Sequence, residues 1–219
     1  AGRGTTVAQN SNNSAFGHSA LTAITTGGYN TAVGYQAGDS ITSGNSNVLI
    51  GRGTGVTMTE ADEMVLIGND AGASINHATA ADGTVAVGYS SLSAITYGAA
   101  NTAVGDNALA GAMNGVDGAV AIGKSALAVL TTGVATGIGY QAGLAHTIGT
   151  GCTYIGYQSG IRFGENTNAD GNTFVGHLSG GGGHTTEGNN TGGDNTALGY
   201  GAFAGGTGTS SSVSADNCV

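Results

Sequence analysis

The fold is decided by the stretch Asn30-Thr31-Ala32-Val33-Gly34-Tyr35-Gln36-Ala37-Gly38, because the chain repeats it almost from end to end. The stretch begins with asparagine, continues with three residues that end on a β-branched one, and then reaches glycine. Shorter copies begin at Asn101 and Asn195. A unit repeated at a fixed spacing indicates one small structural element stacked many times.

The glycine after the apolar residue marks each copy and gives the period of the repeat. Five of the ten intervals between these glycines are 17 residues, and the others lie between 16 and 23. A βαβ unit takes roughly 30 residues or more, and no helical apolar stripe is present. We therefore predict an all-β fold, a parallel β-solenoid of about eleven coils of ~17 residues, with glycine supplying a corner at φ > 0. The predicted turn glycines are Gly17, Gly34, Gly51, Gly68, Gly88, Gly105, Gly123, Gly139, Gly156, Gly176 and Gly199.

The residue before each turn glycine is a strong strand former, and the residue two positions earlier is mostly β-branched. Side chains two apart in a strand point to the same face. We predict that this face lines the inside of the coil. The predicted structural core is Phe16, Val33, Ile50, Ile67, Val87, Val104, Ile122, Ile138, Ile155, Val175 and Leu198.

The residue between those two positions is never charged and never carries an amide. A strand that is apolar on both faces is usually buried on both faces, so we predict that this second face meets another chain. The alternative is that its small residues simply suit a tight coil and face water. The candidate subunit interface is Ala32, Leu49, Leu66, Ala103, Tyr154 and Phe174.

Two further features sit at the edges of the predicted coil. The residue after the turn glycine is often tyrosine, as at Tyr35 and Tyr157, and we favour surface packing there over a carbohydrate-stacking ladder. Three intervals carry insertions, and insertions in a solenoid form loops that often bind ligands. The candidate ligand loop contains His184, Glu187, Asn189 and Asn190.

Composition argues against several classes of partner. Of 219 residues 44 are glycine and none is proline, while only 8% are charged, for a net charge of −9. The four cations are scattered, so we expect no nucleic-acid surface. No apolar run approaches the ~20 residues that span a bilayer, and we expect no membrane insertion. Cys152 and Cys218 form neither a metal spacing nor a disulfide framework.

No catalytic, cofactor or metal motif stands out from the repeats. The glycine-rich segment 51–55 does not lie between a strand and a helix, so it is not a phosphate loop. The five histidines show no pair at metal-ligand spacing. We therefore expect a protein that is not an enzyme. The expected organisation is a lead-in or partial coil over 1–12, the solenoid over 13–204 and a partial repeat or tail over 205–219.

The repeat Asn-Thr-Ala-Val-Gly-Tyr-Gln-Ala-Gly resembles the shaft repeats of phage tail fibres and is similar to the head repeats of trimeric autotransporter adhesins. The likeness runs from about Asn13 to Phe203. It implies a left-handed parallel β-roll with three chains side by side and the alanine face at the trimer interface. The chaperone domain and the coiled-coil stalk that accompany these repeats in the two families are not recognisable in this sequence.

These features lead to one main functional hypothesis and three alternatives. We expect a structural fibre or attachment protein, located on a virion or cell surface or otherwise outside the cell, with a glycan or protein receptor bound by the edge loops. The first alternative is a filament subunit that stacks end to end. Ice binding and polysaccharide depolymerisation are weaker alternatives. Ice binding requires a flat threonine array on an outer face, whereas the threonines here are predicted to point inward.

Overall fold

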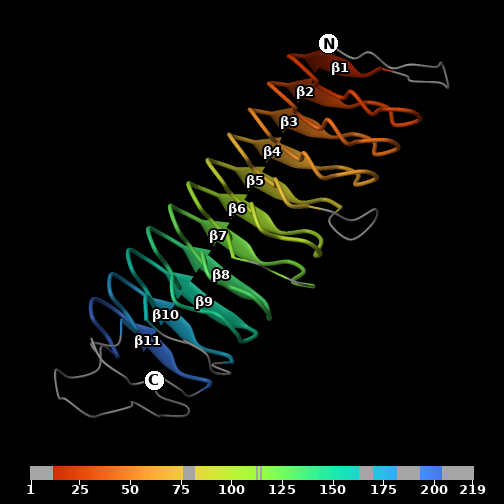
Figure 1. Cartoon of the computed structure of the whole chain (residues 1–219). Coiled ribbons are helices and arrows are strands. Elements are labelled where there is room, and N and C mark those ends of the chain that lie inside the picture. Colours follow the sequence, from red (N-terminus) through yellow and green to blue (C-terminus); the bar gives the residue numbers. More distant parts are fainter. Residues whose placement is uncertain are drawn as a thin grey trace.

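The structure is a computed structural model that describes residues 12–75, 82–111, 113, 115–162, 170–181 and 193–203. It contains one parallel sheet whose eleven short strands follow one another in sequence order. They stack into an elongated β-solenoid with β1 at one end and β11 at the other (Figure 1). The strands are β1 (Ser14–Phe16), β2 (Thr31–Val33), β3 (Val48–Ile50), β4 (Val65–Ile67), β5 (Val85–Val87), β6 (Thr102–Val104), β7 (Val120–Ile122), β8 (Ala135–Ile138), β9 (Cys152–Ile155), β10 (Thr173–Val175) and β11 (Thr196–Leu198).

The predicted all-β parallel solenoid is confirmed. Equivalent residues of neighbouring copies pair directly, as Thr31 pairs with Val48 and Val33 with Ile50. Each strand ends at the residue before a turn glycine. At ~4.8 Å per strand, eleven strands give a rod roughly 50 Å long.

The turn glycines form the corner that ends each strand. Their φ angles lie between 124° and 142°, in the left-handed half of backbone space that other residues rarely enter. Every turn glycine except Gly199 also stacks on the next one along the rod, so that an added Cβ would lie closer than 3.0 Å to a carbonyl oxygen of the following coil. A side chain is therefore excluded at this corner by both conformation and space.

A second wall faces the sheet across the interior. In each of the eleven copies two residues, two positions apart, have φ between 47° and 65°. This alternation turns successive N–H groups toward opposite neighbouring coils: Gln36 N–H donates to His18 O at 2.9 Å, and Gly38 N–H donates to Thr54 O at 2.9 Å. The backbone N–H and C=O groups of this wall are thus hydrogen-bonded to neighbouring coils without a second strand.

The interior is filled from this second wall and from the middle residue of each strand. The wall contributes large aliphatic side chains such as Leu21, Ile41 and Leu92, all of which are buried. Most strands contribute alanine opposite them, so a large side chain on one wall meets a small one on the other. This complementarity makes a thin core that is nevertheless closed to water.

Buried asparagines tie the coils together just before the strands. The Asn47 amide donates to Asn30 Oδ1 at 2.9 Å and to Ala61 O at 2.8 Å, and Asn47 Oδ1 accepts the Met64 N–H at 3.0 Å. Asn195 repeats the contact with Asn172 at 2.9 Å. Because a buried amide is costly when unsatisfied, this ladder fixes the asparagine at the start of the motif.

The stacked corner can be tested by substituting one turn glycine. Gly88→Ala places a Cβ against Gly105 O at φ 138°, and we expect it to lower the free energy of unfolding by at least ~3 kcal/mol. The matched control is Gly83→Ala, at φ 69° with no atom within 4 Å of the added Cβ. This control should cost about 1 kcal/mol. Urea denaturation measures both, and equal losses would contradict the steric account.

Candidate functional site: the outer face of the sheet

The surface that stands out is the outer face, which we define as the first and third residues of the three-residue strands and their register partners in β8 and β9. These side chains point away from the interior and are half-buried or exposed. The outer face comprises Ser14, Phe16, Thr31, Val33, Val48, Ile50, Val65, Ile67, Val85, Val87, Thr102, Val104, Val120, Ile122, Thr136, Ile138, Thr153, Ile155, Thr173, Val175, Thr196 and Leu198.

The prediction that the residue before the turn glycine forms the core is wrong. Val33 and Ile50 are each 38% exposed, and Phe16 and Leu198 at the two ends are 77% and 78% exposed. None of the residues predicted as core is buried: Phe16, Val33, Ile50, Ile67, Val87, Val104, Ile122, Ile138, Ile155, Val175 and Leu198 all lie on the outer face.

The predicted subunit interface is wrong for the same reason. All six of its residues are fully buried inside their own chain, namely Ala32, Leu49, Leu66, Ala103, Tyr154 and Phe174. The two faces of the strand are exchanged because the facing wall already brings large aliphatic side chains. Only a small residue fits opposite them in most coils, so alanine lies inside and the bulkier valine and isoleucine lie outside.

A signal for the correct orientation was present in the sequence. Every turn glycine except Gly176 is followed, three to eight residues later, by apolar residues, such as Ala37 and Ile41 or Leu92 and Ile95. These are buried. A second apolar column with large side chains indicates which strand face must carry the small ones, and that column was not used in the prediction.

The outer face is continuous and carries no charge. Fifteen of its side chains are apolar, and the other seven are serine or threonine. The strand N–H and C=O groups are used in bonds between neighbouring coils, as in Gly34 N–H to Phe16 O at 2.8 Å. Any partner of this face must therefore bind through side chains.

The composition of the outer face changes along the rod. The first outer-face residue of each strand is valine in β3, β4 and β5, whereas it is threonine in four consecutive strands from β8 to β11. The register places those four threonines side by side. The outer face is therefore fully aliphatic over β3 to β5, whereas β8 to β11 carry a row of hydroxyls.

An aromatic row follows the outer face along the corner after the turn glycines. Tyr140 and Tyr157 stack with ring centroids 5.1 Å apart and an interplanar angle of 16°. His177 meets Tyr157 and Tyr200 edge-on, with centroids 5.1 Å and 5.0 Å away. The stacked tyrosines cover each other's faces, which leaves little ring face for a sugar and agrees with the packing interpretation.

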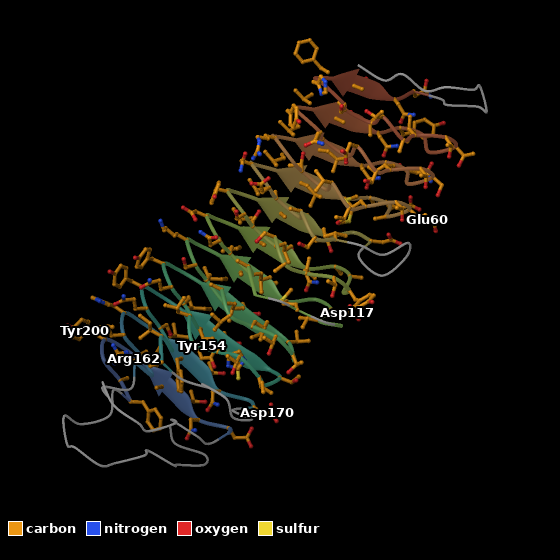
Figure 2. All side chains as sticks on the ribbon, viewed as in Figure 1. Glu60, Asp117, Tyr154, Arg162, Asp170 and Tyr200 are labelled. Carbon is orange, nitrogen blue, oxygen red and sulfur yellow. The ribbon has the colours of Figure 1, made fainter. Side chains whose placement is uncertain are left out.

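Charged side chains gather at the two edges, away from the outer face. Glu60, Asp117 and Asp170 follow one edge of the rod, and Arg162 lies with Tyr200 on the opposite side (Figure 2). Two other cations pair with carboxylates of neighbouring coils: Arg52 with Asp70 at 3.6 Å and Lys124 with Asp106 at 3.3 Å. These exposed pairs contribute little stability, and their charged side chains lie outside the outer face.

Other predicted features lie partly outside the described residues. The candidate ligand loop with His184, Glu187, Asn189 and Asn190 is among the residues that the structure does not describe, as is Cys218. Within the described ranges, no three His, Cys, Asp or Glu side chains are grouped so that they could hold a metal ion. Nor does that part of the chain include a helix that could cross a membrane.

Comparison with protein-family models, with curated proteins and with solved structures finds no match to this chain. The likeness to tail-fibre and adhesin repeats therefore rests on the repeat motif itself.

The orientation of the strands can be tested with neighbouring substitutions in β4. Val65→Thr changes an outer position that is threonine in six other copies, so it should cost less than about 1 kcal/mol. Leu66→Thr places a hydroxyl in the closed interior and removes aliphatic volume, so we expect a loss of ~3 kcal/mol or more. The midpoints of denaturant unfolding of the two variants show which of the two side chains lies inside the coil. A larger loss for Val65→Thr would restore the original assignment.

Proposed function

We propose that this chain is a non-enzymatic structural protein, a rod-like unit of a phage tail fibre or bacterial surface adhesin that assembles side by side as a homotrimer. The observation that carries the proposal is the uncharged, largely apolar outer face, which runs along all eleven strands. The resemblance of the repeat motif to fibre and adhesin repeats supports the same role, and implies a location on a virion or cell surface. Host or receptor binding is assigned to the edge loops.

The size of the outer face favours a partner over water. Eleven strands at ~4.8 Å and three residues at ~3.3 Å give a projected area of about 500 Å². The largest exposed apolar patch on a soluble monomer is typically about 300–600 Å² and is often an interaction site. A covered outer face would remove this surface from water along the whole rod.

The chemistry of the outer face favours another copy of the same chain as that partner. A second copy has the same strand spacing, so its valine and isoleucine ridges match those of the first along the full length. The labelled charges Glu60, Asp117, Asp170 and Arg162 lie at the edges and do not have to be buried in the contact. Threonine hydroxyls of β8 to β11 lie opposite one another when the chains run parallel and in register.

The proposal is tested by placing a charge on the outer face. Ile122→Lys puts three ammonium groups into one layer of the trimer, and like charges brought together in an interface cost several kcal/mol. We expect this variant to be a monomer of 20.9 kDa, whereas the unmodified chain has three times that mass. Size-exclusion chromatography with light scattering measures both.

Val129→Lys is the matched control. Val129 is 40% exposed and Ile122 is 39% exposed, but Val129 lies in the turn segment after β7 rather than on the outer face. This variant should remain a trimer. A monomeric unmodified chain at micromolar concentration, or equal behaviour of the two variants, contradicts the proposal. Particles of indefinite length would instead favour the end-to-end filament.

Ice binding becomes a second candidate because the structure overturns the argument against it. The threonines of β8 to β11 point outward, in four register-matched parallel strands. The outer face cannot hold ice and a neighbouring chain at the same time. For the trimer we expect no thermal hysteresis in a freezing-point assay, while hysteresis from a monomeric sample would replace the fibre proposal.

A further inference from the structure

A histidine occupies an interior position that is aliphatic in the other described coils. His146 lies three residues after a left-handed wall residue, and its N–H donates to Gly143 O at 3.0 Å. The residues at the same place in other coils are Ile24, Ile41, Met58, Ile75, Ile95 and Leu130, all buried. His146 is fully buried as well, so an ionisable ring stands in the apolar column of the β8 coil.

The hydrogen bonds of His146 define a neutral ring. Its Nδ1 lies 3.1 Å from the Tyr154 hydroxyl, and its Nε2 lies 3.4 Å from Gly149 O. A carbonyl only accepts, so the assigned tautomer has Nε2–H donating to Gly149 O, while Nδ1 accepts from the Tyr154 O–H. The arrangement uses both ring nitrogens.

Tyr154 links this ring to β9 and β10. It is the third residue of β9 (Figure 2), packs against Phe174 with ring centroids 5.8 Å apart, and is fully buried. Gly143 and Gly160 make room for it, since a Cβ on either would lie closer than 3.0 Å to its ring. Loosening Tyr154 therefore loosens the contact between three successive strands.

The ionisable groups around His146 in the described residues are Tyr154, Cys152 and Asp170. The charge of Asp170, whose Oδ1 accepts the Thr150 N–H at 2.7 Å, favours a protonated ring. Burial opposes it more strongly and lowers the pKa of His146 below the ordinary value of about 6.5. Burial also raises the pKa of the Cys152 thiol and of the Tyr154 hydroxyl, so both stay protonated at neutral and acidic pH.

We propose that the junction of the β8 and β9 coils is an acid-sensitive opening point in the rod, operated by His146. A proton on Nδ1 removes the acceptor for the Tyr154 O–H and leaves a charge in an apolar interior. Opening the coil returns the ring to water, where the charged imidazolium is solvated and no longer carries the free-energy penalty of burial. This inference concerns the coil itself and does not depend on the proposed function.

The sign of the pH effect follows from the lowered pKa. Just below pH 6.5 the opened coil binds a proton on His146 and the closed coil does not. The closed coil therefore loses stability relative to the open coil as the pH falls. The loss continues until the pH reaches the pKa of the closed coil and then stops. Over that window the population of the open form rises up to about tenfold per pH unit.

The thiol of Cys152 provides the readout, because it is buried beside Tyr154 and reacts only when the coil opens. Cys218→Ser in the 219-residue chain leaves one thiol, whose rate of reaction with a dipyridyl disulfide is measured from pH 7.5 to pH 5. The rate is divided by that of the same chain carrying His146→Met, which restores the aliphatic column. Division cancels the intrinsic pH dependence of the thiol. We expect the ratio to rise several-fold below pH 6.5.

Two controls keep the test decisive. His177→Gln removes an exposed histidine at the corner and should leave the unmodified pH profile unchanged. If His146→Met does not fold, the imidazole of His146 is titrated by NMR in the unmodified protein, with a pKa below 6.5 expected. A flat ratio, a profile that moves with His177→Gln, or a His146 pKa at or above 6.5 overturns the proposal.

Discussion

The stacking of the turn glycines is the constraint on which the rest of the structure depends. Hydrogen bonding between coils sets the strand spacing at ~4.8 Å, and at this spacing the backbone of one corner lies directly against the next. A Cβ at ten of the eleven turn glycines would lie closer than 3.0 Å to a carbonyl oxygen of the following coil. The glycine therefore fixes where each strand ends, and with it the register of the whole sheet.

The register determines what the side chains can do. Because identical corners stack, identical positions of the motif form continuous columns: asparagine amides in one, small interior residues in another, and valine and isoleucine on the outer face. A column multiplies the effect of one residue type along the rod. The Asn30–Asn47 contact is modest by itself, but it recurs between Asn172 and Asn195 and ties neighbouring coils together at the edge of a thin core. The same repetition turns a single exposed valine into an apolar surface as long as the rod.

Much of this architecture is predictable from sequence because it is local. The period, the positions of the strands and the class of fold follow from the glycine spacing and from β-branched residues such as Thr31 and Val33. Which face of each strand points into the coil depends on tertiary packing. When Ala32 and Val33 are both apolar, alternation divides the side chains into two sets without saying which set is inside. That choice is made by Leu21 and Ile41 on the opposite wall, so it can be read only when this second apolar column is considered together with the strand.

The proposed interface was placed on the wrong face of the strand for the same reason. Both strand faces are apolar, as predicted, but the face that lies outside the coil carries Val33 and Ile50 rather than Ala32 and Leu49. The special chemistry of His146 was also missed, since a histidine among dispersed histidines has no local signature. It becomes visible only when the repeats are aligned by structure and the ring is found in an aliphatic column.

The central claim is that three such rods lie side by side through their outer faces. The most direct measurement is the mass per unit length of unmodified particles imaged by electron microscopy at low concentration. We predict short rods of about 50 Å whose mass per length is three times that of one chain of 20.9 kDa spread over that distance. Rods with the mass per length of a single chain would contradict the account.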